Sequence, residues 1–165
     1  LCICVNSNKI HYEFERNTIM KIENRKARYE YELLQTYICG IVLQGSEVKS
    51  LRSCKANISD AYCYVSKGEV WIKNMHISKI DSNVFTNHEE YRVCKLLLTK
   101  QEIIKIEQSL KTTGITLVPL KIFSNSHNLI KMEIAICRGK KQYDKRNAIK
   151  DKDNKRELDR IYKQF

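Results

Sequence analysis

Residues 115–137 read ITLVPLKIFSNSHNLIKMEIAIC and contain the two strand patterns from which the fold can be built. The first pattern includes Pro119, which lacks a backbone N–H and so restricts its strand to an edge or a bulged position. The second pattern alternates cleanly, because apolar side chains at every other position share one face of a strand. These side chains are Ile130, Met132, Ile134 and Ile136, with Lys131 and Glu133 on the other face.

Two further stretches have the composition of strands. Residues 29–43, YEYELLQTYICGIVL, alternate at first and then become apolar, and we expect Gly40 to mark a bend or bulge. Residues 61–77 read as a hairpin, with Lys67 and Gly68 at the turn. Several short antiparallel strands and two helices predict a mainly β fold, a small closed barrel with flanking α-helices.

The clearest helix pattern covers residues 99–114. Thr99 followed by Glu102 is a capping box, and Gly114 lies where a C-terminal cap is expected. Apolar side chains at helical spacing, from Ile103 to Leu110, form one face.

A second helix is predicted for residues 45–59, GSEVKSLRSCKANIS. Its apolar positions recur at i+3 spacing, and a parallel basic stripe lies beside them on the helix surface. The stripe is open to two interpretations: it faces a polyanion, or it is only the solvated edge of an amphipathic helix. Its members are Lys49, Arg52 and Lys55.

Charge and cysteine content narrow the class of protein. The chain has 165 residues and a formal net charge of +11, which favours a polyanionic partner, nucleic acid before an acidic membrane surface. No apolar run approaches the roughly 18–20 residues of a membrane span, so we expect no membrane association through a helix. Seven scattered cysteines without zinc-site spacing predict reduced thiols and no metal centre.

The two ends of the chain differ from its middle. Residues 1–23 show no period and are predicted to be a flexible leader, while residues 24–138 hold the barrel. Residues 138–165 carry eleven Lys/Arg and five Asp/Glu, so this end supplies +6 of the net charge of +11. We expect the basic tail, residues 139–165, to be disordered when free and to fold on a surface that neutralises it.

The sequence offers no catalytic constellation. The four histidines are scattered, and His76 is interpreted as a strand residue rather than a ligand. No glycine-rich phosphate loop or nucleophile elbow occurs among the five glycines. Asp60 and Asp81 have no spaced carboxylate partner for a two-metal nuclease. Tyrosines interleaved with cations, beside a basic helix and tail, favour RNA binding instead.

Several blocks resemble the SmpB family of tmRNA-binding proteins, in its order and at about its spacing. They are ENRKARYEYEL, GSEVKSLRSCKANISDAY, GEVWIKNMHIS, RVCKLLLTKQEI, TLVPLKIF and RGKKQYDKR. The resemblance implies an OB-type barrel that binds the tRNA-like domain of tmRNA and delivers it to a stalled ribosome. Elongation factor Tu would take part indirectly, through aminoacylated tmRNA. The tail would enter the vacant mRNA channel and fold there as a helix. Neither catalysis nor a cofactor is implied.

The resemblance also implies roles for individual residues. On the barrel, Asn24, Arg25, Lys26 and Arg28 would approach RNA, and the tRNA-like domain would be supported or contacted by Glu47, Lys49, Arg52, Lys55, Asn57 and Lys131. Contacts with the ribosome would come from Tyr29, Gly139, Lys140, Lys141, Asp144, Lys145, Arg146, Lys150, Lys152, Lys155, Arg156, Arg160, Ile161 and Tyr162.

Two departures from the family pattern and two rival functions stay open. Tyr29 stands where the family usually has His, so a decoding-centre contact is expected to be replaced by stacking. Ile38 stands where the family often has an acidic residue, so one polar RNA contact is expected to be missing. The rivals from other classes are a basic structural protein of the ribosome or general tRNA-binding OB module, and a metal-dependent RNA-processing enzyme. Heavy use of Lys, Asn and Ile favours a plastid-type organelle over a bacterial cytoplasm.

Overall fold

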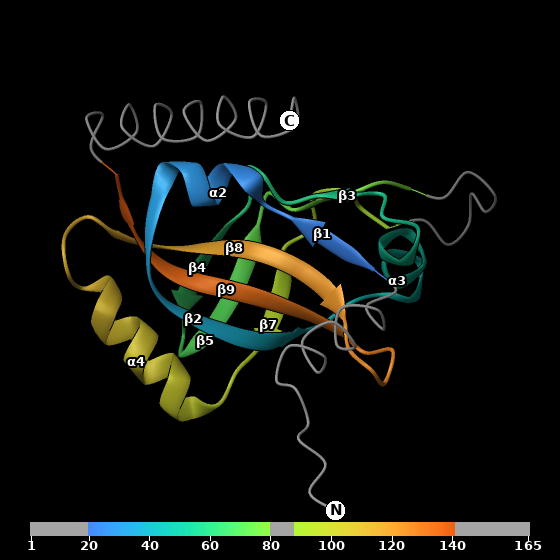
Figure 1. Ribbon diagram of the computed structural model, residues 1–165. Coiled ribbons are helices and arrows are strands. Elements are labelled where there is room, and N and C mark those ends of the chain that lie inside the picture. Colours follow the sequence, from blue (N-terminus) through green and yellow to red (C-terminus); the bar gives the residue numbers. More distant parts are fainter. Residues whose placement is uncertain (1–19, 80–87, 141–165) are drawn as a thin grey trace, which may run out of the picture.

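The computed structural model describes residues 20–79 and 88–140, and in them the predicted barrel is confirmed (Figure 1). Hydrogen-bonded neighbours follow the order β8, β4, β5, β7, β2 and β9, and pairing of β9 with β8 closes the ring. All these pairings are antiparallel. The strands are β2 (Tyr31–Ile41), β4 (Tyr62–Ser66), β5 (Glu69–Lys73), β7 (Cys94–Leu97), β8 (Ile115–Ser124) and β9 (Ile130–Gly139).

Strands β8 and β9 correspond to the two strand patterns of residues 115–137. The predicted face of β9 is buried, with Met132 and Ile134 fully enclosed in the main core. The register shifts between Pro119 and Lys121, which confirms the bulge that proline requires. The alternative of an edge strand is wrong, because β8 also pairs with β4 and with β1 (Lys21–Glu23) on its other side.

The hairpin turn is confirmed, and the bulge expected at Gly40 is not. Lys67 and Gly68 both have positive φ, 52° and 71°, as a tight hairpin turn between β4 and β5 demands. Gly40 instead pairs regularly with Leu97 on one side and Lys131 on the other. The irregularity of β2 lies nearer its start, between Leu33 and Gln35.

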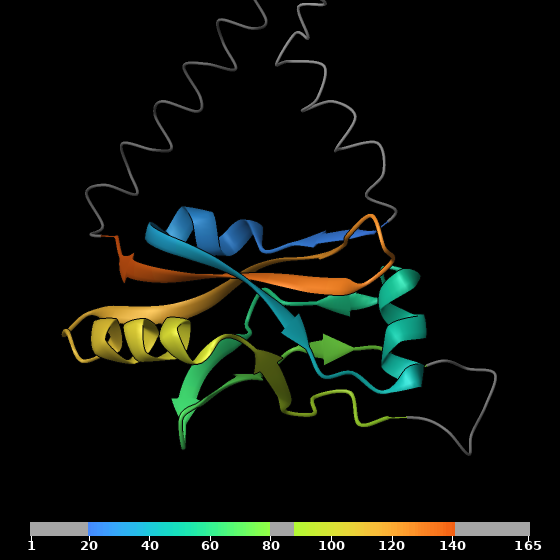
Figure 2. The ribbon, with the colours of Figure 1, turned by 90° about the horizontal axis from the view of Figure 1, so that it is seen from below.

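Helix α4 (Lys100–Leu110) and helix α3 (Gly45–Arg52) lie at opposite ends of the barrel in both ribbon views (Figure 2). The capping box of α4 is confirmed, and Ile106 is fully buried. Gly114 is not its cap, because the helix ends at Leu110 and Gly114 lies in the turn before β8 with φ of 84°. Helix α3 is shorter than predicted, since Cys54 adopts a φ of 55°.

Because α3 ends at Arg52, the residues after it are free to form one of two short strands. Residues Ala56–Asn57 form β3, which pairs with β6 (His76–Ile77) in a separate two-stranded sheet. His76 is therefore a strand residue, as interpreted from the sequence, and its ring lies 5.1 Å from that of Tyr91.

The N-terminal part of the barrel corrects two predictions. Residues 21–23 are strand β1 rather than leader, because they pair with residues 121–123 of β8, and Met20 is buried in the main core. Residues 25–30 form helix α2 (Arg25–Glu30), although a strand was predicted from Tyr29. Helix α2 covers a second, smaller core outside the ring, made of Ala27, Val118, Leu120, Ala135 and Cys137.

Candidate nucleic-acid interface

Asn24 fixes helix α2 to the barrel. Its side-chain oxygen accepts a hydrogen bond from Ala27 N–H at 2.9 Å, and its amide nitrogen donates to the carbonyls of Ile58 and Pro119 at 3.0 and 3.1 Å. The side chain is therefore saturated, and the residue is only 2% exposed. Asn24 thus positions the cations of α2, and its expected approach to RNA stays a prediction that this burial does not favour.

Those cations are exposed, as expected, but they are not equivalent. Arg25 and Arg28 make no ion pair among the described residues, whereas Lys26 Nζ lies 2.9 Å from Asp60 Oδ1. The hydrogen bond from Lys26 to Asp60, together with that charge, raises the pKa of Lys26. Lys26 thus spans from α2 to the segment before β4, while the two arginines remain available to an anion.

The start of the basic tail lies against the same helix. Gly139, at the end of β9, pairs with Tyr31, and Lys140 donates from its backbone N–H to Glu30 O at 3.0 Å. The Lys140 ammonium donates to Arg28 O at 3.2 Å. Tyr29, which departs from the family pattern, is 42% exposed between these groups on α2. The remaining predicted ribosome contacts, from Lys141 to Tyr162, lie outside the described residues.

Helix α3 is held in place by a buried carboxylate. Glu47 has a side chain only 1% exposed, and it accepts hydrogen bonds from Arg92 Nε and Nη2 at 2.9 and 2.7 Å and from Gln44 N–H at 2.6 Å. Burial raises the pKa of Glu47, but these hydrogen bonds outweigh it and hold the pKa below 4.5. The burial of Glu47 favours the supporting role over direct RNA contact, and that role stays a prediction.

The basic stripe of α3 faces solvent. Lys49 and Arg52 are exposed on the helix, and Lys55 is exposed just beyond its end. Asn57 is also exposed, but its side-chain oxygen already accepts a hydrogen bond from Ser59 N–H at 2.9 Å. The stripe is therefore available to a partner, which meets the structural requirement of the polyanion interpretation.

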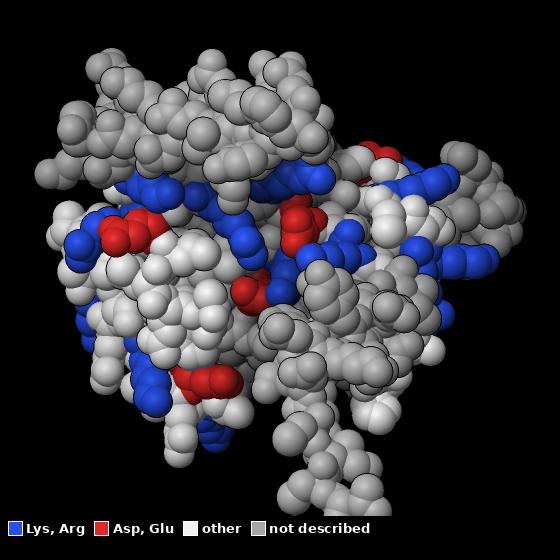
Figure 3. Space-filling view, in the orientation of Figure 1, with Lys and Arg blue, Asp and Glu red and all other residues white. Residues whose placement is uncertain are grey.

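A groove of about 410 Å³ brings Arg52 together with Lys131 of β9. Its apolar wall includes Leu97 and Leu129, which are 53% and 56% exposed. Neither leucine was predicted from the sequence, because each adjoins the apolar residues of a core strand. In the space-filling view, Lys and Arg gather around α2 and on the side of α3 (Figure 3). The barrel thus has two basic regions.

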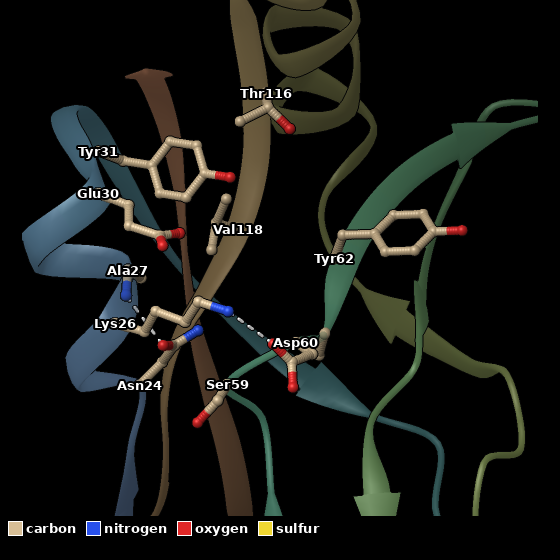
Figure 4. A pocket seen from close by; sticks show the side chains of 11 residues that line it. Asn24, Lys26, Ala27, Glu30, Tyr31, Ser59, Asp60, Tyr62, Thr116 and Val118 are labelled. Atoms are coloured by element: carbon tan, nitrogen blue, oxygen red, sulfur yellow. Dashed lines mark hydrogen bonds and ion pairs between the residues drawn. The ribbon is translucent and has the colours of Figure 1, made fainter. Parts of the chain in front are cut away.

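A pocket of about 250 Å³ lies beneath α2 (Figure 4). Lys26 and Glu30 reach it from the helix, and Asp60 and Tyr62 line the opposite side. Among the tyrosines of the strands, Tyr62 is 41% exposed at this pocket, while Tyr37 is in the core at 8%. Glu30 and Asp60 were not predicted as site residues, since acidic side chains are not an RNA-binding signal in sequence.

Three further features of the described residues are their thiols, the grouping of possible metal ligands and the character of their helices. Burial raises the pKa of Cys39 to about 12 and those of Cys94 and Cys137 to about 11, so these thiols stay protonated near neutral pH. In residues 20–79 and 88–140, no three His, Cys, Asp or Glu side chains are grouped for a metal ion. Within those same ranges, no helix has the length and apolar character needed to cross a membrane.

A closed antiparallel barrel with exposed cations on its outer helices and exposed tyrosines defines the class of barrel proteins suited to nucleic-acid binding. Residues 21–164 match the family described as SmpB protein. The chain belongs to the SmpB family.

Individual relatives with high sequence identity support membership of that family. The SsrA-binding protein of Phocaeicola vulgatus is 47% identical over 146 residues, covering 88% of this chain and 97% of the relative. The SsrA-binding protein of Wolbachia pipientis subsp. Culex pipiens is 52% identical over 141 residues, covering 86% and 95%. These relatives are bacterial, so they give no support to the plastid-type location expected from residue usage.

A solved structure shares the fold. It is described as "tmRNA-SmpB: a journey to the center of the bacterial ribosome", and the matched chain is 38% identical with a TM-score of 0.63. The match covers 74% of this chain and 85% of the other. The OB-type barrel expected from the resemblance is therefore confirmed by its likeness to a solved structure.

Proposed function

We propose that this protein binds the tRNA-like domain of tmRNA and delivers it to stalled ribosomes for trans-translation. The carrying observation is the groove in which Arg52 of α3 and Lys131 of β9 meet beside exposed leucines. Two cations from separate elements can neutralise neighbouring phosphates, and the apolar wall can take a sugar or base face. The names of the relatives, SsrA-binding proteins, support tmRNA as the RNA.

The two basic regions suggest a division of roles. The stripe of α3 with Lys131 would hold the tRNA-like domain, with Lys55 and Asn57 at its margin. The α2 region would approach the ribosome through Arg25, Arg28 and Tyr29, and the tail would leave from it beside Lys140. Elongation factor Tu would act through aminoacylated tmRNA. The protein would work wherever tmRNA and bacterial-type ribosomes occur together.

The tail has a separate role in this proposal. Leu158, Ile161, Tyr162 and Phe165 recur at i, i+3, i+4 and i+7, the spacing of one helix face. An isolated helix of this length is marginal in water, so folding would need the phosphate-lined mRNA channel. The predicted contacts between Lys141 and Tyr162 belong to this step. The proposed role is binding and placement of RNA, without catalysis.

Paired lysine and arginine variants test the RNA-binding surface. In Lys49→Met/Arg52→Met, the log–log salt slope of tRNA-like-domain binding should fall by roughly 1.4–1.8, about 0.7–0.9 for each phosphate that the variant no longer neutralises. The matched control is Lys100→Met/Lys105→Met, which removes two exposed cations from α4 at the other end of the barrel. A control that lowers the slope equally would refute the assignment of the surface.

Truncation after Lys141 tests the division of roles. Affinity for the tRNA-like domain should stay within a few-fold of the full chain, because the α3 stripe and Lys131 are retained. Tagging of nascent peptides on stalled ribosomes in a reconstituted translation system should disappear. Failure of the truncated chain to bind RNA would contradict the division.

A further inference from the structure

The pocket beneath α2 has a charge pattern unlike the surface around it. Two carboxylates, Glu30 and Asp60, and one ammonium, Lys26, line it, so its local balance is negative within a basic region. Ala27 and Val118 provide an apolar wall behind them. A phosphate is repelled by such a pair of carboxylates, whereas a group that donates hydrogen bonds is attracted.

The polar groups of the pocket can exchange their present partners for hydrogen bonds to a ligand. Lys26 and Asp60 are paired at 2.9 Å, but their side chains are 49% and 73% exposed, so the pair is solvated and weakly held. The half-buried Glu30 has no side-chain hydrogen bond or ion pair to any residue that the structure describes. Figure 4 shows its carboxylate and the Tyr31 hydroxyl on the α2 side of the pocket, across from Asp60 and Tyr62.

We propose that this pocket binds an unstacked guanine of the RNA partner. The Watson–Crick edge of guanine has two neighbouring N–H donors, at N1 and the exocyclic amino group, beside the acceptor O6. Two carboxylates and one ammonium complement that pattern, two acceptor groups for the donors and one donor for O6. Uracil presents a single donor between two acceptors, and cytosine or adenine presents only an amino group as donor.

The surroundings suit a base that has left its stack. Unstacked RNA bases are commonly recognised on their hydrogen-bonding edges and packed against aromatic rings, and Tyr31 and Tyr62 line this pocket. The exposed Arg25 and Arg28 of α2 would hold the flanking phosphates. Phosphate contacts would then position the strand while the pocket selects the base. The inference rests on the proposed RNA-binding function and adds base selectivity to it.

The test compares short fluorescein-labelled oligouridines that carry a central guanosine, inosine or uridine, by fluorescence anisotropy at one salt concentration with the full chain. The guanosine oligomer should bind about tenfold more tightly than the uridine oligomer, within the range for a good bidentate base contact. Inosine keeps N1–H and O6 but lacks the amino group, so its affinity should be intermediate.

Variants assign the preference to the pocket. Glu30→Gln and Asp60→Asn should each bring the guanosine and uridine affinities to within about twofold or threefold, because an amide offers a neutral acceptor in place of a carboxylate. The matched control is Glu107→Gln, on the exposed face of α4, which removes one negative charge elsewhere. It should strengthen binding to all oligomers alike and leave the guanosine preference unchanged.

Equal affinity of the full chain for guanosine and uridine oligomers would overturn the inference. A preference that survives in both pocket variants would overturn it as well. Binding of the tRNA-like domain, measured in parallel, separates this inference from the proposed function. Tight binding of that domain without oligomer selectivity removes only the guanine pocket, whereas absence of any preference for that domain over tRNA removes the proposed function.

Discussion

Replacement of Arg92 by Met should destabilise the fold more than any exposed ion-pair change. Arg92 donates two hydrogen bonds to Glu47, whose side chain is 1% exposed, and a third, of 3.4 Å, to Val42 O. Without Arg92, the hydrogen bond from Gln44 N–H is the only one that the described residues still give the buried carboxylate. Breaking a buried pair by removing one partner costs about 3–5 kcal/mol. We expect about 3 kcal/mol, because Arg92 is 28% exposed and one hydrogen bond to Glu47 remains.

The destabilisation should depend on pH with a definite sign. In the native protein the pKa of Glu47 is below 4.5, so its contribution to stability is present above pH 4.5 and is lost as the pH falls through the native pKa. In Arg92→Met, the Glu47 carboxyl is buried without its arginine partner, and this burial should raise the pKa of Glu47 above 4.5. The penalty is then fully present near pH 7 and shrinks as the pH falls and Glu47 becomes protonated.

Urea unfolding with a reducing agent at pH 7 and pH 5 measures both effects. Lys21→Met is the control, because its ion pair with Glu23 is exposed on both sides and should contribute less than about 1 kcal/mol. The double variant Arg92→Met/Glu47→Gln should be more stable than Arg92→Met, since it removes the unpaired charge. A destabilisation below about 1 kcal/mol that does not change with pH would refute the reasoning.

Three other experiments probe local features. Gly68→Ala should lower the free energy of unfolding by about 1 kcal/mol, because a residue with a Cβ is strained at a φ of 71°. Gly45→Ala at the start of α3 should be neutral or slightly stabilising, because no atom crowds the site. Chemical denaturation compares the two variants. Tyr37→Phe should raise the free energy of unfolding by about 1 kcal/mol, because its buried hydroxyl has no hydrogen-bond partner among the described residues; a lower melting temperature would contradict this. Iodoacetamide at pH 8 should modify Cys54 before the four buried cysteines of the described ranges, as peptide mass mapping would show, and equal labelling of Cys39 would exclude the proposed protection by burial.

The features that the sequence predicted are those determined by neighbouring residues. Alternation in β9, the Thr99 capping box and the Lys67–Gly68 turn each depend on side chains a few positions apart. The basic stripe of α3 was also visible, since Lys49 and Arg52 follow helical spacing. Such local patterns were enough to predict a barrel with flanking helices.

The features that the sequence could not predict depend on distant partners. Helix α2 has six residues and one buried side chain, Ala27, so it lacks an apolar stripe. The helix forms because the Asn24 side chain donates hydrogen bonds to the carbonyls of Ile58 and Pro119, which are 34 and 95 positions away. The burial of Glu47 could not be predicted because Arg92, which pairs with it, is 45 positions further along the chain.

The candidate site shows the same limit. Arg52 and Lys131 were each predicted to contact RNA, but only the folded barrel brings them to one groove. Leu97 and Leu129 complete that groove from a strand and a loop whose apolar residues gave no sign of exposure. The acidic lining of the α2 pocket was equally hidden, because Asp60 reaches Lys26 across 34 positions.

Selective recognition of tmRNA can be measured by a gel-shift titration of the full chain with the tRNA-like domain of tmRNA, using elongator tRNA as competitor at several salt concentrations. We predict tight binding that excess tRNA does not displace, with a log–log salt slope of roughly −0.7 to −0.9 for each neutralised phosphate. Weak binding that tRNA displaces equally well would contradict the proposed function and leave only a general RNA-binding barrel.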